Sequence, residues 1–221
     1  MSFTRETFDF LSALAAQNSK DWFEANRDRY EAHWKAPALE FIADISPKMA
    51  RLNPPLMAEP RLNGSLRRIN RDVRFSKDKS PYNARLHMIF WVGGHPNRSP
   101  GVHIVLNPDG VGYGAGQFGI EPAALARLRK RIVDSQDGDQ LIKALDLAGE
   151  VGCRMGDPDL VRLPKGFEAT GRRADVLRHK AIVARTFDGD AKADAIIGEA
   201  GRDWIIGIAR ALLPLVRWLD G

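Results

Sequence analysis

The stretch Arg85–Phe118 reads RLHMIFWVGGHPNRSPGVHIVLNPDGVGYGAGQF, and its hydrophobic pattern decides the fold class. Apolar residues at 86, 88, 90 and 92 alternate with a more mixed set at 85, 87, 89 and 91. The alternation returns over residues 102–107, and a period of two is typical of a strand with one apolar face. The turn composition of Asn107-Pro108-Asp109-Gly110 then leads into a third strand over residues 111–118. The stretch therefore predicts an antiparallel meander rather than the parallel sheet of nucleotide-binding folds.

The third predicted strand has a face without side chains. Glycine occupies positions 112, 114 and 116, which are every second residue of the strand. Such a face can accept close packing against the backbone. On the first two strands, His87 and His103 fall on the less apolar face, where they could pair across the hairpin.

Helical patterns flank the sheet on both sides. Residues 4–52 have the three-and-four spacing of amphipathic helices, with Thr4 and Ser19 as N-caps and Ser46-Pro47 expected to start a last turn. Residues after the sheet predict a short strand over 181–187, a turn at 188–190, and a final helix over 203–219 that Pro214 kinks. We therefore expect one α+β domain over residues 1–221, with the meander packed between N-terminal and C-terminal helices. Its parts are a helical region 4–52, a sheet core 64–118 and a mixed helical region 121–221.

Composition places the chain in the ordinary globular range. It has 221 residues, of which 44% are hydrophobic and 28% charged, enough to bury a core without disulfides. Its one cysteine cannot form an internal disulfide, and zinc-ligand spacings are absent, so we expect a reducing compartment and no metal or cofactor. No secretion signal is visible, and the most apolar segment, 205–218, is too short and too interrupted to span a bilayer. The sequence predicts a cytoplasmic protein without a membrane partner.

A second stretch, Arg67–Tyr82, carries the charge of the chain. Between residues 61 and 85 there are eight basic and two acidic residues, a local charge of +6, whereas the whole chain is +5. Everything outside this basic strip therefore sums to about neutral. Arginines with loop amides and hydroxyls suit a phosphate or a carboxylate, because guanidinium groups match planar anions with paired hydrogen bonds.

We therefore expect a pocket for a small anionic ligand that bears phosphate or carboxylate. If residues 66–75 are extended, Asp72 lies between like-facing arginines and can hold their geometry. The predicted ligand-binding residues are Arg68, Arg71, Arg74, Lys77, Lys79 and Tyr82. The candidates for proton transfer are Asp72, His87 and His103. The opposing interpretation is an internal salt-bridge lattice, in which the arginines of this stretch pair with Asp72 and Asp78.

The sequence leaves open whether the protein is an enzyme. The Gly-rich phosphate loop, His-Glu-x-x-His and Gly-x-Ser-x-Gly are all absent. If it is an enzyme, the arginines would stabilise developing negative charge while a histidine or Asp72 moved the proton. One alternative is a nucleic-acid-binding module that uses the strip 61–85, with Trp91 stacking on a base. It is disfavoured because the basic residues lie in one tight block between near-neutral helices. Another alternative is a non-catalytic scaffold that docks a protein partner.

Residues 68–82, which read RINRDVRFSKDKSPY, resemble an uncharacterised bacterial and fungal group, the domain-of-unknown-function family numbered 2461. Supporting similarity comes from Trp22-Phe23, from Pro122 with Leu125 and Arg129, and from residues 163–167. The resemblance spans nearly the whole chain. It implies a single α+β domain and a cytoplasmic protein, and it supplies no activity, substrate or catalytic residue.

Overall fold

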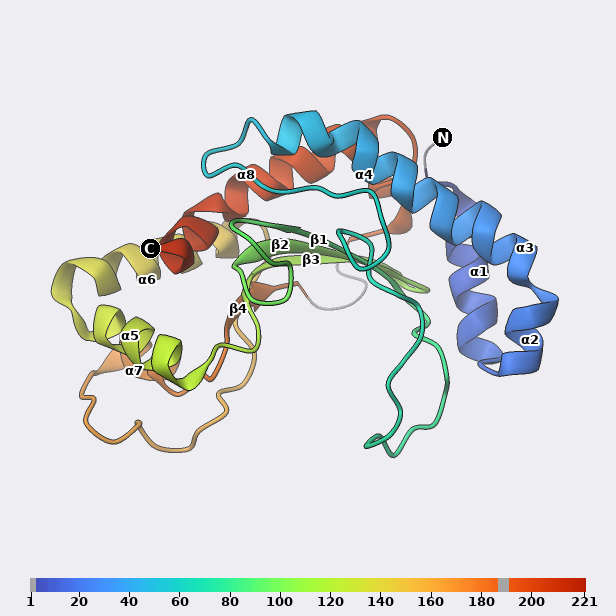
Figure 1. The fold of residues 1–221 in the computed structure, drawn as a ribbon. Helices are drawn as coiled ribbons and strands as arrows, with labels where there is room; N and C mark the ends of the chain where they lie inside the picture. Colours follow the sequence, from blue (N-terminus) through green and yellow to red (C-terminus); the bar gives the residue numbers. More distant parts are fainter. Residues whose placement is uncertain (1–2, 187–190) are drawn as a thin grey trace.

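The computed structural model describes residues 3–186 and 191–221 (Figure 1). Its elements follow in the order α1 Arg5–Ala16, α2 Lys20–Ala25, α3 Arg27–Tyr30, a π-helical turn Glu31–Lys35, α4 Ala36–Met49, β1 Leu86–Trp91, β2 Gly101–Asn107, β3 Gly110–Gln117, α5 Pro122–Val133, α6 Ser135–Glu150, α7 Gly171–Leu177, β4 Ile182–Arg185, a 3-10 turn Ala193–Ala195 and α8 Ala200–Asp220. Helices lie at both ends of the chain and strands in between, so the predicted α+β class is confirmed.

The sheet is antiparallel and its four strands follow the order of the chain, β1-β2-β3-β4. The first three strands are the predicted meander, with Leu86 opposite Leu106 and Ile104 opposite Tyr113. The short strand predicted over 181–187 is β4, which pairs with the far edge of β3. Residue 187 of that prediction, and the turn predicted at 188–190, lie outside the described residues.

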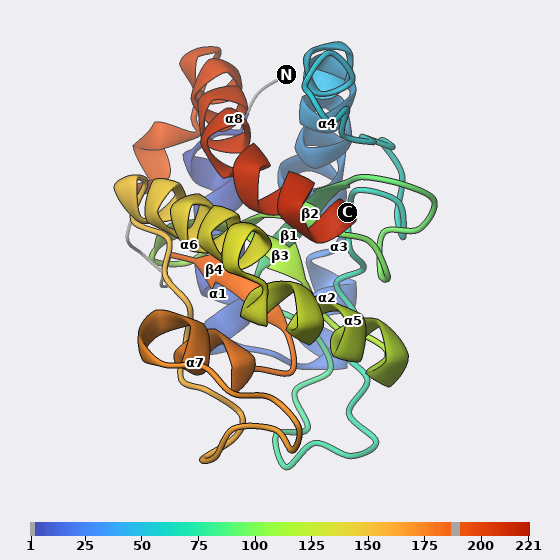
Figure 2. The same cartoon turned by 90° about the vertical axis from the view of Figure 1, so that its left-hand side faces the viewer.

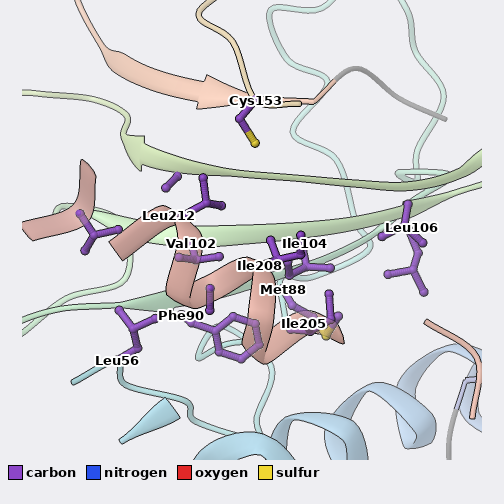
Figure 3. Packing of buried hydrophobic residues seen from close by; sticks show 14 of the residues in the cluster. Leu56, Met88, Phe90, Val102, Ile104, Leu106, Cys153, Ile205, Ile208 and Leu212 are labelled. Atoms are coloured by element: carbon purple, nitrogen blue, oxygen red, sulfur yellow. The ribbon is translucent and has the colours of Figure 1, made fainter. Parts of the chain in front are cut away.

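One face of the sheet carries the hydrophobic core. In Figures 1 and 2, α4 and α8 lie over this face, while α1 to α3 and α5 to α7 flank the sheet at opposite ends. Figure 3 shows α8 side chains, among them Ile205, Ile208 and Leu212, packed against those of β1 and β2. The alternating residues predicted for this face are all fully buried, namely Leu86, Met88, Phe90, Val102, Ile104 and Leu106. The opposite face is therefore left for the polar side chains of the strands.

The N-terminal helices agree with the prediction except at two points. Thr4 stands at the N-cap of α1, but its side chain makes no capping hydrogen bond. Ser19 caps α2, since its hydroxyl accepts a hydrogen bond from the Trp22 amide at 3.2 Å. The predicted restart at Ser46-Pro47 is wrong, because α4 continues through Pro47 to Met49. A proline near the end of a helix removes one backbone hydrogen bond, and only a few residues follow it here.

Residues 66–75 do not form the extended strand considered from the sequence. Leu66 contacts the sheet through an isolated bridge to Met88, and Asn70 bridges to Tyr82 across the base of the loop that follows. Asp72 binds the amide of Arg74, and Asp78 binds the amide of Ser80. Such local side-chain bonds compete with a strand ladder, and this competition explains the loop.

Candidate functional site

The basic loop, Arg67–Tyr82, extends from the side of the sheet opposite α4 and α8 (Figures 1 and 2). Its base is fixed to the N-terminal helices by a two-point contact. The Asn18 amide donates to the Tyr82 carbonyl at 2.9 Å, and the Tyr82 amide donates to Asn18 Oδ1 at 3.1 Å. The buried Tyr82 ring also stacks on Phe23, with 4.2 Å between ring centroids. The loop therefore starts from a rigid base.

Within the basic loop, the two acidic residues bind two of the arginines. Arg71 forms an ion pair with Asp78 and donates to the Ser80 carbonyl at 3.2 Å. Hydrogen bonds from the Ser80 hydroxyl and amide, and then from Arg71, lower the pKa of Asp78 to about 2. Arg74 binds Asp72 through Nη2 at 2.7 Å and Nε at 3.0 Å. Part of the salt-bridge lattice is thus present, although exposed ion pairs contribute little to stability.

The lattice does not neutralise the basic loop. Six basic residues stand against two acidic ones between residues 67 and 82, which leaves a charge of +4. Within the described part of the chain, Arg68 and Lys77 are exposed and have no carboxylate partner. Phe75, near the loop tip, is 94% exposed, with the Arg74 guanidinium 5.8 Å from its ring centroid. The loop therefore presents free cations and one bare aromatic ring to solvent.

The predicted histidine pair is present on the face of the sheet that α8 does not cover. His87 Nε2 and His103 Nδ1 lie 2.9 Å apart, a hydrogen bond across adjacent strands. They are diagonal neighbours, because His87 is opposite Val105 and His103 is opposite Ile89. Burial lowers the pKa of His87 to about 3 and of His103 to about 4, with nearby Arg67 adding to both shifts. Both rings are neutral near pH 7.

A cavity of about 250 Å³ lies on this face, and we call it the histidine cavity. Its floor includes Gly112 and Gly114 of β3, which have no side chains to fill it. Close packing of β4 is the other consequence of these glycines: a Cβ on Gly114 would lie 2.5 Å from the carbonyl oxygen of Ala184. The lining residues are Arg85, His87, His103, Val105, Gly112, Tyr113, Gly114, Phe118, Val183, Arg185 and Thr186.

A second, more polar pocket of about 470 Å³ lies between the basic loop and the end of α1, and we call it the loop pocket. Its walls include Asn18, Arg71, Ser80 and Tyr82. Arg85 lines both this pocket and the histidine cavity, so the two hollows adjoin at this side chain.

The predicted site residues are therefore divided between places. Arg71 and Tyr82 lie at the loop pocket, whereas His87 and His103 line the histidine cavity. The remaining predicted residues, Asp72, Arg68, Arg74, Lys77 and Lys79, line neither hollow. Hydrogen bonds from Arg74 lower the pKa of Asp72, which favours a carboxylate over a proton donor.

Sequence reasoning named neither arginine of the histidine cavity among the ligand-binding residues. Arg185 lies on β4, a hundred residues beyond Arg85, and reaches the cavity because β4 pairs with β3. The available signal was the alternation over 181–187, which predicts a strand without specifying its neighbour. Within the described ranges, neither Arg85 nor Arg185 has a carboxylate partner.

In residues 3–186 and 191–221, no group of three or more histidine, cysteine, aspartate and glutamate side chains could hold a metal ion. No helix in this part of the chain combines the length and apolar composition needed to cross a membrane. Cys153 is buried and forms no disulfide.

The fold and these two hollows define an α+β protein with a polar face on its antiparallel sheet. The chain belongs to the family described as conserved hypothetical protein (DUF2461), whose model matches residues 6–218. The resemblance noted in residues 68–82 is thereby confirmed over nearly the whole chain. No curated protein and no solved structure matches the chain.

Proposed function

We propose that the protein binds a small carboxylate- or phosphate-bearing molecule in the histidine cavity, with Arg85 and Arg185 as its cationic contacts. The observation that carries this proposal is a cavity lined by two arginines that lack carboxylate partners among the described residues. Guanidinium groups of this kind bind anions with paired hydrogen bonds. At about 250 Å³ the cavity is below the ~300–1,000 Å³ typical of pockets for drug-sized ligands. A small ligand fits this size.

The basic loop contributes to the proposed binding in two ways. Arg71 and Tyr82 support the neighbouring loop pocket, which meets the histidine cavity at Arg85. The exposed cations of the loop, Arg68, Arg74, Lys77 and Lys79, supply a positive field that raises the local concentration of anions. These four residues attract the ligand in this proposal and do not hold it.

The histidine pair gives the cavity a means of proton transfer. When both rings are neutral and share one hydrogen bond, each ring has one nitrogen outside that bond. Of these two nitrogens, one carries a proton and the other a lone pair, whichever tautomers are present. An anion bound beside the rings favours the imidazolium form and raises their pKa. His87 and His103 are therefore the groups we propose for acid or base chemistry if the protein is an enzyme. Asp72, engaged by Arg74, is the weaker candidate.

Thermal unfolding in the presence of phosphate and of short carboxylates tests the proposal. A ligand that binds the folded state raises the melting temperature according to its concentration and affinity. The double variant Arg85→Ala/Arg185→Ala should lose this protection, while Arg127→Ala, an exposed arginine on α5, should keep it. Equal protection of the double variant and the natural protein would show that the anion binds elsewhere.

Single-stranded nucleic acid is the second candidate ligand, and the exposure of Phe75 is the observation that favours it. Trp91, the residue first considered for stacking, is only 2% exposed, whereas Phe75 is 94% exposed beside the free cations of the loop. Stacking of one base on an aromatic ring contributes about 1–3 kcal/mol. In this case Phe75→Ala should weaken oligonucleotide binding, and the affinity should fall steeply with salt. Binding that is insensitive to both changes excludes this candidate.

The third candidate is a non-catalytic scaffold that docks a protein partner. The same exposed surface supports it, since a protein partner could cover Phe75. We also propose that the protein works in the reducing environment of the cytoplasm, consistent with its one cysteine, which is buried and forms no disulfide.

A further inference from the structure

We infer that the ligand of the histidine cavity carries two anionic groups, one bound by Arg85 and one by Arg185, with an apolar segment between them. This inference rests on the proposed function and specifies its ligand. The chemical class is a short dianion, such as a linear dicarboxylate or a phosphorylated carboxylate.

The register of the sheet separates the two arginines. Arg85 directly precedes β1, at the end of the sheet where Asn107 pairs with Gly110, whereas Arg185 on β4 pairs with Gly114. The two positions thus differ by three strand spacings across the sheet and by the four residues from Gly110 to Gly114 along it. At ~4.8 Å per spacing and ~3.4 Å per residue, their Cα atoms are roughly 20 Å apart. The arginines stand at opposite corners of the cavity.

This separation disfavours one small anion shared by both guanidinium groups. A shared anion would require both side chains to stretch fully across the floor, over the histidines, with loss of their rotamer freedom. Two anions at the two corners require no such extension. Neither arginine has a carboxylate partner among the residues described. A dianion therefore neutralises both guanidinium groups, whereas a monoanion leaves one of them without a counter-charge.

The middle of the cavity suits an apolar segment. In the sheet register, Val105 and the bare backbone of Gly112 lie between the arginines, and the ring of Phe118 also lines the cavity. Phe118 is 48% exposed and stands edge-on to His103, with 5.3 Å between ring centroids. The histidines are neutral and supply no compensating positive charge at this point. An anionic group is therefore better placed at either end of the ligand than at its centre.

Binding measured by calorimetry for a series of linear dicarboxylates and the monocarboxylates of matching length tests the inference. For the best length, we expect the dicarboxylate to bind the natural protein at least tenfold more tightly than its monocarboxylate partner. Arg85→Ala and Arg185→Ala should each reduce dicarboxylate affinity to the level of the monocarboxylate. Each single variant should weaken monocarboxylate binding by no more than about twofold, because one of two equivalent sites remains. Arg127→Ala is the matched control and should change neither affinity.

The outcomes separate this inference from the proposed function. If both ligand classes bind within twofold of each other, and only the double variant loses them, the cavity binds anions and the two-ended ligand is wrong. If no carboxylate or phosphate binds, both proposals fail. Circular dichroism of each variant checks that the fold is retained, as expected for two exposed side chains.

Discussion

At the scale of single residues, the histidine pair is the clearest chemical feature. His87 and His103 share a hydrogen bond of 2.9 Å on the face of the sheet that α8 does not cover, and burial keeps both neutral. Arg67, which acts on both rings, and Arg85, which acts on His87, oppose protonation further. The pair therefore resists protonation in the folded protein more strongly than in the unfolded chain.

This difference predicts a loss of stability in acid. Above the unfolded pKa of about 6.5, neither state protonates these rings, so they add no pH dependence. Below about pH 6.5 the unfolded chain binds protons at these two rings. The folded protein binds them only near pH 4 at His103 and near pH 3 at His87. The free energy of unfolding should fall over this window, by up to ~1.4 kcal/mol per pH unit for each histidine.

Denaturation curves of the double variant His87→Gln/His103→Asn check the prediction. Its amides keep a hydrogen-bonding atom near each ring nitrogen of the pair and cannot be protonated in this range. The slope of unfolding free energy against pH should be shallower in the variant. Carboxylates with a lowered pKa, such as Asp78 at about 2, also make stability fall in acid below about pH 5, but both proteins contain them, so the difference between the two slopes reports the histidines. An unchanged slope would show that the histidines are not the responsible groups.

At the scale of elements, the contact between β3 and β4 builds the proposed site. Gly114 allows β4 to approach closely, and β4 in turn brings Arg185 to the cavity. The same glycine face forms part of the cavity floor. The packing of β4 and the proposed ligand binding therefore depend on one backbone feature.

Gly114→Ala should disturb both properties. The added methyl group would lie 2.5 Å from both the Ala184 carbonyl oxygen and Arg185 Cβ, so β4 must shift. Overpacking of this kind costs about 1–3 kcal/mol, and anion protection should weaken as Arg185 moves. Gly149→Ala is the control, since nothing lies within 4 Å of its added Cβ in α6 and alanine favours a helix. Urea denaturation of both variants measures the difference, and equal stability would contradict the close contact.

At the scale of the whole molecule, one hydrophobic cluster joins the N-terminal helices, the sheet and α8. It extends from Phe3 to Leu219, and Leu212 of α8 lies fully buried at the sheet (Figure 3). A shared cluster supports the proposal that residues 1–221 form one domain. We expect a single cooperative unfolding transition.

Leu212→Ala tests this cooperativity. Removal of a fully buried leucine side chain typically costs about 2–5 kcal/mol, and in one domain the loss lowers the stability of every part together. Leu147→Ala, at a leucine that is 41% exposed, should cost much less. Tryptophan fluorescence and circular dichroism should report coincident transitions in both variants. Separate transitions would indicate two independently folding units.

Local patterns were sufficient for much of the fold. The alternation over residues 86–92 and 102–107 predicts two strands and their buried faces, because a period of two is a property of the strand itself. Local patterning also predicted the pairing of His87 with His103, since the short connection makes neighbours of adjacent strands. It failed over residues 66–75, where Asp72 and Asp78 bind nearby amides and hold a loop.

By itself, then, the sequence determined the α+β class, the meander, the histidine pair and the excess positive charge of the basic loop. Only the tertiary structure decided that Arg71 and Arg74 are bound by acids of their own loop, and that Arg185 joins Arg85 at one cavity. The physical reason is the separation along the chain between the residues that interact. Strand periodicity and local charge depend on near neighbours in the chain, whereas the pairing of β4 with β3 brings together residues a hundred positions apart.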